Sequence, residues 1–335
     1  MDQVNHQDKI NASEYGIIWS QYVNDSMSRC VFRYFLNDVK DENTRALLQF
    51  ALELSETHIE RTKQLLIQEN YPIPIGFTDE DVTVKAPNLF TDTFKVIYLQ
   101  IMAIHGMTRY AGATSLCIRE DVRKYLIECT SQTLELYDRV TAVALSKGIL
   151  SKPPTLNNKQ KIDFIMKQNY LTGWFGKRRP INAIEISGAH LNMQKNMVKM
   201  VLELGFSQVC QSKDVREYFE RARKLCKRHF HILGEMLEEE NLQKPSIFES
   251  EVTDSTVPPF SDKLMLFHIA TLLSAALGYY GEALSMCQRR DLSADYARMN
   301  MEIALIAEDG MNLLIDKGWM EQPPIATDHE NLAND

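Results

Sequence analysis

Two histidines occupy inward-facing positions of helical sequence patterns, where an imidazole could bind a metal ion. Around His58, apolar residues recur at spacings of three and four, and the histidine continues the stripe that contains Ala51 and Leu54. His229 continues the corresponding stripe after Ala222 in the second half of the chain. A buried imidazole needs a partner for each ring nitrogen, which a hydroxyl, a carboxylate, a water molecule or a metal can provide.

Three further polar residues lie at a similar depth in neighbouring helical patterns. His105, Glu135 and Asp138 fall near the middle of their stretches, as His58 does, and Glu135 and Asp138 are one helical turn apart. Two histidines with one or two carboxylates suit iron, manganese or zinc. The spacing therefore predicts a metal site with His58, His105, Glu135 and Asp138 as candidate ligands, and His229 as the candidate in the second half.

The alternative is a purely structural histidine. His58 would then bond Tyr22 or a backbone carbonyl, while Glu135 and Asp138 would face water. Ferritin-like di-iron proteins carry a Glu-x-x-His motif on two of their helices. Here Ser55 stands three residues before His58, which disfavours a carboxylate-bridged di-iron centre.

The sequence contains two copies of one helical unit. "YAGATSLCIRED" from Tyr110 returns as "YGEALSMCQRRD" from Tyr280. Such regular self-similarity indicates a tandem duplication, with predicted domains at 1–155 and 181–335 and a linker at 156–180. Further positions pair at a constant offset: His58 with His229, Asn70 with Asn241, Pro74 with Pro245 and Phe77 with Phe248.

The duplication does not preserve the candidate ligands. Ala275 and Leu305 stand where the first half has His105 and Glu135. A metal in the second half would therefore need other ligands. Because the halves share mainly caps, turns, glycines and prolines, the repeated text is predicted to be mostly scaffold.

Each half predicts four long helices from the spacing of its apolar residues. Asn11 with Glu14, and Asn182 with Glu185, form capping-box patterns at the first helix of each half. The predicted helices span 11–38, 42–70, 91–118 and 121–147, then 182–209, 213–241, 261–288 and 291–317. The other shared signals are Asp121 and Asp291 as expected caps of the fourth helix, Arg119 and Arg289 as their hydrogen-bonding partners, and Gly148 and Gly318 as helix ends.

The connection between the second and third helices sets the topology. Residues 71–90 are long enough, when extended, to run the whole length of a bundle, whereas the other connections within a half are short. Short connections give antiparallel neighbours, and the long one makes the second and third helices parallel. We therefore expect an all-α fold of two tandem ferritin-like four-helix bundles, each with one long crossover.

These duplicated features resemble a known family. The crossover "PIPIGFTDEDV", the turn "SLCIREDV" and the closing "KG" and "PP" dipeptides look like an uncharacterised ferritin-like family of spore-forming bacilli, similar to spore coat protein F. The resemblance covers both halves. It implies a ferritin-like fold and a link with sporulation, and it carries no established activity.

Composition narrows the class of protein. The 335 residues carry a formal net charge of -8, which argues against nucleic-acid binding through a basic face. The sequence lacks a signal-peptide layout and a continuous apolar run long enough for a transmembrane helix. Its six cysteines are scattered singly, as in proteins of reducing compartments. We expect a cytoplasmic or spore-associated protein.

The predicted linker 156–180 mixes aromatic residues with the basic run 177–179. This mixture would suit a nucleic-acid or membrane contact. Alternatively, its aromatic residues pack on one bundle while its cations stay solvated, and the acidic composition favours this second interpretation. The aromatic residues are Phe164, Tyr170, Trp174 and Phe175.

Two functional hypotheses follow. The first is a non-enzymatic structural or interaction protein connected with sporulation. The second is a metal-binding protein, with iron or manganese and an oxidase activity in the first bundle. The pattern at 261–288 is apolar nearly all round, which predicts burial between two bundles or in a dimer interface. The expected partners are accordingly a second copy of the chain or a spore-associated protein.

Overall fold

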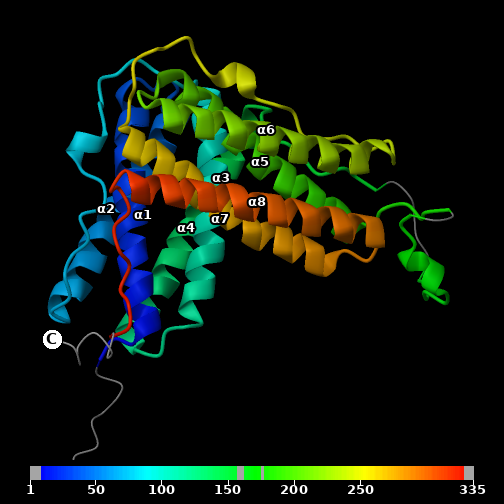
Figure 1. Cartoon of the computed structure of the whole chain (residues 1–335), viewed down its shortest axis with the longest axis horizontal. Helices are drawn as coiled ribbons and strands as arrows, with labels where there is room; N and C mark the ends of the chain where they lie inside the picture. The colour runs from blue at the N-terminus through cyan, green and yellow to red at the C-terminus, as the bar shows by residue number, and fades with distance from the viewer. Residues whose placement is uncertain (1–8, 157–161, 175–176, 328–335) are drawn as a thin grey trace, which may run out of the picture. The chain divides into compact units, whose positions relative to one another are not determined.

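The computed structural model describes residues 9–156, 162–174 and 177–327, and within these ranges the fold is all-α. Each repeat contributes four α-helices, which confirms the predicted all-α fold of two tandem four-helix units (Figure 1). Three short 3-10 helices lie in the connections: η1 (Asp79–Asp81), η2 (Gln168–Leu171) and η3 (Glu249–Glu251). The α-helices are α1 (Ala12–Asn37), α2 (Glu42–Gln68), α3 (Asp92–Thr114), α4 (Glu120–Ser146), α5 (Ala183–Val209), α6 (Lys213–Glu238), α7 (Asp262–Met286) and α8 (Arg290–Asp316).

The predicted capping boxes are present at the first helix of each repeat. The side chain of Asn11 accepts the backbone N–H of Glu14, and the Glu14 carboxylate accepts the backbone N–H of Asn11. Asn182 and Glu185 make the same reciprocal pair at the start of α5. Each box satisfies two backbone donors that a helix start leaves without intrahelical acceptors, so the sequence pattern fixes these two helix starts.

Residues with left-handed backbone end the second and fourth helices of each repeat. Gly148 and Gly318 have φ of 67° and 66°, as their positions predicted. Asn70 and Asn241 have φ of 58° and 56° after α2 and α6. Asparagine tolerates this conformation better than most residues, which explains why the duplication repeats it there.

The start of the fourth helix differs from the prediction. Arg289 occupies the N-cap position of α8 and Asp291 lies in the first turn, rather than at the cap. In the first repeat α4 begins at Glu120, so Asp121 also lies in the first turn. Each aspartate instead accepts hydrogen bonds from the guanidinium of the arginine two residues earlier, Arg119 or Arg289, and its negative charge still favours a helix N-terminus.

The hydrogen bonds at the helix ends establish the direction of the second bundle. The backbone N–H groups of Gln211 and Ser212, just before α6, donate to Asp262 at the start of α7. The backbone N–H of Gln288, just after α7, donates to Glu185 at the start of α5. Helices α6 and α7 therefore begin at the same end and run parallel, with the long connection between them crossing the bundle.

The chain divides into two compact units whose composition differs from the two repeats. Unit 1 contains 1–84, 102–139 and 320–335, and unit 2 contains 85–101 and 140–319. The division falls inside α3 and α4. The domain boundaries expected from the repeat, 1–155 and 181–335, describe the duplicated sequence and remain a prediction.

Unit 1 has an apolar core at the end of the bundle where α1 begins. Within this unit, the C-terminal stretch is attached to the crossover, because the Glu321 carboxylate accepts the backbone N–H groups of Ile75 and Gly76 at 2.8 and 3.0 Å. Gly76 has φ of 60°, and a Cβ there would lie 2.5 Å from Ser26 Oγ. The core residues are Ile10, Ile18, Leu65, Leu66, Cys117, Val122, Tyr125, Leu126 and Cys129.

Unit 2 buries α5 and α7 on most of their surfaces. In the described residues, α7 is the one helix that is long and apolar enough to cross a membrane by length and composition. Of its apolar window, 61% is buried inside the protein, as in the central helix of a bundle. Its His268 bonds the hydroxyl of Tyr98, a residue of the α3 segment that belongs to unit 2.

In the linker, two aromatic residues are exposed and two arginines form ion pairs, which is the opposite of the expected packed aromatic residues and solvated cations. Phe164 and Trp174 are 79% and 62% exposed, so they do not pack on a bundle. Arg178 instead binds Asp291, and Arg179 binds Glu185. Tyr170 stacks on Arg179, itself a linker residue, and its hydroxyl bonds Gln288 after α7; Phe175 lies outside the described residues.

Candidate functional site: two buried histidine networks

His58 lies in the middle of α2 and is almost wholly buried. Its Nε2 atom lies 3.2 Å from Oε1 of Gln132 on α4. Its Nδ1 atom lies 3.4 Å from Oδ2 of Asp25 on α1 and 3.4 Å from the hydroxyl oxygen of Tyr110 on α3. Each ring nitrogen therefore faces an oxygen that can accept a hydrogen bond from an N–H group. A charged imidazolium, with an N–H on both nitrogens, fits this environment.

The charge of Asp25 decides the protonation of His58. Burial by itself lowers the pKa of His58, but the charge and hydrogen bond of Asp25, with a smaller contribution from Cys129, raise it to about 11. The buried Asp25 Oδ2 atom lies 3.4 Å from His58 Nδ1, close enough for its negative charge to favour the imidazolium. His58 thus carries a proton on each nitrogen at neutral pH.

His229 occupies the equivalent place on α6 and is fully buried. Its Nε2 atom lies 2.7 Å from Oε2 of Glu302 on α8, and its Nδ1 atom lies 3.2 Å from the hydroxyl of Tyr280 on α7. Asn196 on α5 donates through Nδ2 to the same hydroxyl at 2.8 Å. A neutral imidazole that donates from Nε2 and accepts at Nδ1 satisfies this chain of hydrogen bonds.

The environment of His229 favours that neutral form. Burial lowers the pKa of His229 to about 4, although its hydrogen bond to Glu302 favours the charged form. Glu302 also binds Arg228 at 2.9 Å, so part of its negative charge is already balanced. The positive charge of nearby Lys199 is a further contribution to this lowering of the His229 pKa. The two repeats therefore keep the same histidine in opposite protonation states.

The reversal follows from an exchange of side chains around the histidine. In the first repeat the carboxylate is Asp25 on the first helix, and the fourth helix supplies the amide of Gln132. At the equivalent positions of the second repeat, the first helix supplies the amide Asn196 and the fourth helix supplies the carboxylate Glu302. Tyrosine on the third helix bonds Nδ1 in both.

Two of the other predicted ligands, Glu135 and Asp138, lie at the surface. Glu135 is about half exposed and forms an ion pair with Arg139 on its own helix, and Asp138 is exposed. His105 lies half-buried on α3. Glu135 and Asp138 are exposed, as in the structural alternative, and His58 bonds Gln132 and Tyr110 rather than the expected Tyr22.

The described ranges contain no group of three or more His, Cys, Asp and Glu side chains that could hold a metal ion. The metal site remains a prediction from the sequence. The partners that sequence reasoning missed are Asp25, Gln132 and Glu302, since aligning the repeats pairs equivalent positions without showing which of them contact a histidine.

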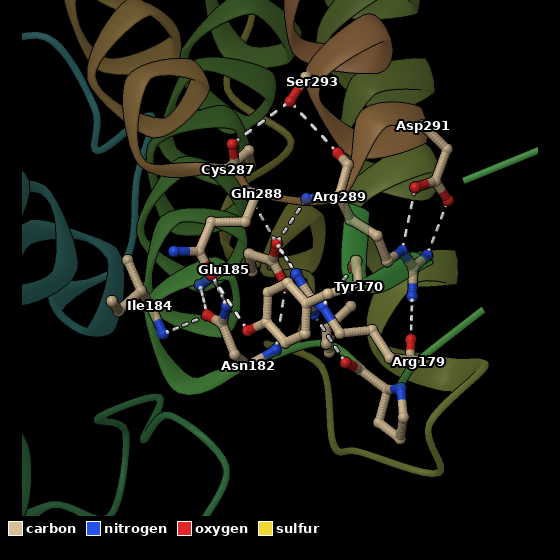
Figure 2. Close-up of polar contacts among 12 residues, drawn as sticks. Tyr170, Arg179, Asn182, Ile184, Glu185, Cys287, Gln288, Arg289, Asp291 and Ser293 are labelled. Atoms are coloured by element: carbon tan, nitrogen blue, oxygen red, sulfur yellow. Dashed lines mark hydrogen bonds and ion pairs between the residues drawn. The ribbon is translucent and has the colours of Figure 1, made fainter. Parts of the chain in front are cut away.

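A second polar cluster lies at the end of the second bundle (Figure 2). The Glu185 carboxylate accepts the backbone N–H groups of Asn182, Gln288 and Arg289, each at 3.0 Å. The Arg179 guanidinium donates two hydrogen bonds of 2.8 Å to the same carboxylate. Burial alone would raise the pKa of Glu185, but Arg179 and the backbone donors lower it, so the charge is held by fixed partners.

Arg289 completes this cluster from the turn between α7 and α8. Its side chain is 2% exposed and binds both carboxylate oxygens of Asp291, at 3.0 and 2.8 Å. It also donates to the Arg179 carbonyl and lies 3.6 Å from Glu240 after α6. The expected role of Arg289 and Asp291 in turn hydrogen bonding is confirmed, and the cluster joins the ends of α5, α6, α7 and α8 with the linker.

The first repeat has a simpler version of this cluster. Glu14 accepts the backbone N–H groups of Ile118 and Arg119 at 2.8 and 2.7 Å. Arg119 binds Asp121 and Glu69. The duplicated arginine and aspartate therefore serve the closure of each bundle rather than a ligand.

Comparison with known proteins agrees with this duplicated architecture. A family described as "Protein of unknown function (DUF3231)" matches residues 1–162 and again residues 169–332. No curated protein matches the chain. One similar solved structure is described as a "putative spore coat protein" from Bacillus halodurans C-125; it shares 16% sequence identity, has a TM-score of 0.41, and the match covers 45% of this chain and 98% of that one. The family resemblance expected from the repeated motifs is thus confirmed: the chain belongs to the DUF3231 family and contains two tandem copies of it.

Proposed function

We propose that this protein is a non-enzymatic helical scaffold that works through its surface, in association with the spore. The observation that carries the proposal is the complete use of the two buried histidines by intramolecular partners. His58 is held by Asp25 and Gln132, and His229 by Glu302 and Tyr280. An imidazole whose two nitrogens are occupied serves to fix the register of helices.

The bundle-end clusters support the same conclusion. The residues that the two repeats share most clearly, Glu14 with Arg119 and Glu185 with Arg289, bind helix ends and turns. Their charges are compensated within the fold. The residues that the repeats share therefore stabilise the arrangement of the helices. A partner protein would contact surface residues that differ between the repeats.

The spore connection rests on the resemblance of the crossover, turn and closing motifs to a family of spore-forming bacilli. Immunoblots of a sporulating culture, separated into mother-cell and purified-spore fractions, test it. The chain is expected in the spore fraction. Accumulation in vegetative cells with none in spores would remove sporulation from the proposal and leave the scaffold.

Elemental analysis tests the non-enzymatic scaffold against the metal hypothesis. Untagged wild-type protein and His58→Ala are purified without chelator and analysed for iron, manganese and zinc by mass spectrometry. The scaffold proposal expects sub-stoichiometric metal in both and no uptake of added Fe(II). Stoichiometric metal that disappears in His58→Ala would overturn it and make the first bundle a metal site.

A further inference from the structure

The stretch after the first repeat exposes apolar side chains that the fold does not use. Ile162, Phe164 and Met166 are 98%, 79% and 83% exposed. Ile165 between them is 59% exposed, and Trp174 is 62% exposed. Single exposed apolar residues are ordinary on protein surfaces, whereas five within thirteen residues form a patch that calls for a partner.

The backbone of this stretch is firmly attached at its other end. Tyr170 stacks on Arg179, and its hydroxyl donates to Gln288 at 3.1 Å. Gly173 approaches the backbone of Asp291 so closely that a Cβ would lie 2.4 Å from the Asp291 nitrogen. Figure 1 shows η2 and its flanks beside the turn between α7 and α8, outside the helices of unit 2. The exposed apolar residues 162–166 thus precede a segment that is fixed by contacts with the turn between α7 and α8.

The charge of the stretch is opposite to that of the protein as a whole. Between 157 and 177 the sequence has four lysines, at 159, 161, 167 and 177, and one acidic residue, Asp163, in a chain of net charge -8. The nearby Arg178 and Arg179 are already paired with carboxylates. Lys167 and Lys177 are exposed. Cations beside exposed apolar and aromatic side chains are the combination that binds anionic lipid surfaces, since the apolar groups enter the acyl boundary and the lysines remain among the headgroups.

We propose that residues 162–174 form a peripheral membrane anchor that inserts Ile162, Phe164 and Met166 into the surface of an anionic bilayer, with Trp174 at the interface. A second copy of this chain fits less well. One groove on it, between α6 and α8, has a volume of about 380 Å³, and half of the residues that line it are carboxylates: Asp214, Glu217, Asp309 and Asp316. Such a groove would accept the lysines and reject the apolar side chains.

Flotation of the full chain with lipid vesicles tests the anchor. Vesicles of phosphatidylcholine alone are compared with equal mixtures of phosphatidylcholine and phosphatidylglycerol, at low and high salt. The wild type is expected to float with the anionic vesicles, and Ile162→Ser/Phe164→Ser/Met166→Ser to bind on the order of tenfold more weakly. Lys167→Glu/Lys177→Glu is expected to weaken binding and reduce its salt dependence.

A matched control uses exposed apolar residues elsewhere. Met301 and Leu305 on α8 are 70% and 66% exposed, and Met301→Ser/Leu305→Ser should float like the wild type. Circular dichroism verifies that all variants are folded. The tryptophan emission of the wild type should shift to shorter wavelength with anionic vesicles, and Trp174→Phe should lose this shift.

Three results would overturn the anchor. They are absence of wild-type flotation on anionic vesicles, equal flotation of the triple serine variant, and vesicle-independent self-association that the triple variant abolishes. The last would show instead that the patch is a contact between protein chains.

Discussion

Asp25 and Glu302 are the carboxylates that contact the buried histidine of their repeat, and they do so from different helices. Asp25 approaches His58 from the first helix of the first repeat, and Glu302 approaches His229 from the fourth helix of the second repeat. An amide takes the vacated position in each case, Gln132 in the first and Asn196 in the second. The total of one carboxylate and one amide around the histidine is therefore preserved, while the protonation of the imidazole is reversed.

The first prediction concerns Asp25→Asn. The pKa of His58 is about 11 in the folded protein, above its value of about 6.5 in an unfolded chain. The stabilisation from its charged form is therefore complete below about pH 6.5 and is lost as the pH rises toward 11. Asp25→Asn should lower the free energy of unfolding by about 2 kcal/mol near pH 6, with a smaller deficit near pH 9.

Urea unfolding at both pH values measures this difference. The matched variant is Asp25→Asn/Gln132→Glu, which recreates the arrangement of Asn196 and Glu302 in the second repeat. It is expected to recover part of the stability lost at pH 6. An Asp25→Asn deficit that is the same at both pH values would show that the ion pair with His58 does not carry the charge effect.

The second prediction has the opposite pH dependence. The pKa of His229 is lowered to about 4, so its stabilising contribution is complete above about pH 6.5 and is lost as the pH falls toward 4. Buried His268, whose pKa burial also lowers to about 4, acts in the same direction. His229→Gln should therefore reduce the loss of stability between neutral pH and about pH 5.

The control for this measurement is His231→Gln, because His231 is an exposed histidine on the same helix. Its urea midpoint should follow the wild type at every pH. If His229→Gln and the wild type lost stability in parallel on acidification, titration of His229 would not be the cause.

The third prediction compares Glu185→Gln with Glu14→Gln. Both carboxylates accept backbone N–H groups from a capping box and from the turn between the third and fourth helices of their repeat, but Glu185 alone also neutralises the largely buried guanidinium of Arg179. Glu185→Gln should cost about 3 kcal/mol and Glu14→Gln about 2 kcal/mol, measured by chemical denaturation. Equal costs would mean that the Arg179 pair adds no stability beyond the caps.

The fourth prediction isolates backbone conformation. Gly148 and Gly318 have positive φ, and a Cβ at either would meet nothing within 4 Å. Replacement by alanine should therefore destabilise by about 1 kcal/mol each through φ alone. Gly112 lies inside α3 with equally open surroundings, and Gly112→Ala should stabilise by about 0.5–1 kcal/mol because alanine favours a helix. A loss of stability at all three glycines would point to contacts rather than to φ.

Helices, caps and repeats could be predicted from the sequence because they depend on local patterns. Asn11 and Glu14 lie three residues apart, and the spacing alone dictates that each can bond the backbone of the other. The same holds for Gly148 and Gly318, since a glycine after a helical pattern ends the helix through its backbone freedom. The duplication supplied a second, independent copy of each signal.

The partners of the buried histidines were decided by tertiary structure. Periodicity placed His58 on the inward face of its helix, yet several residues of the other three helices lie at the same depth. Depth does not give the rotation of a helix about its axis, and Glu135 and Gln132, one turn apart, differ in that respect: one faces solvent and the other reaches His58. The protonation of His58 and His229 depends in turn on those partners and on burial, so only the packed bundles determine that one imidazole is charged and the other neutral.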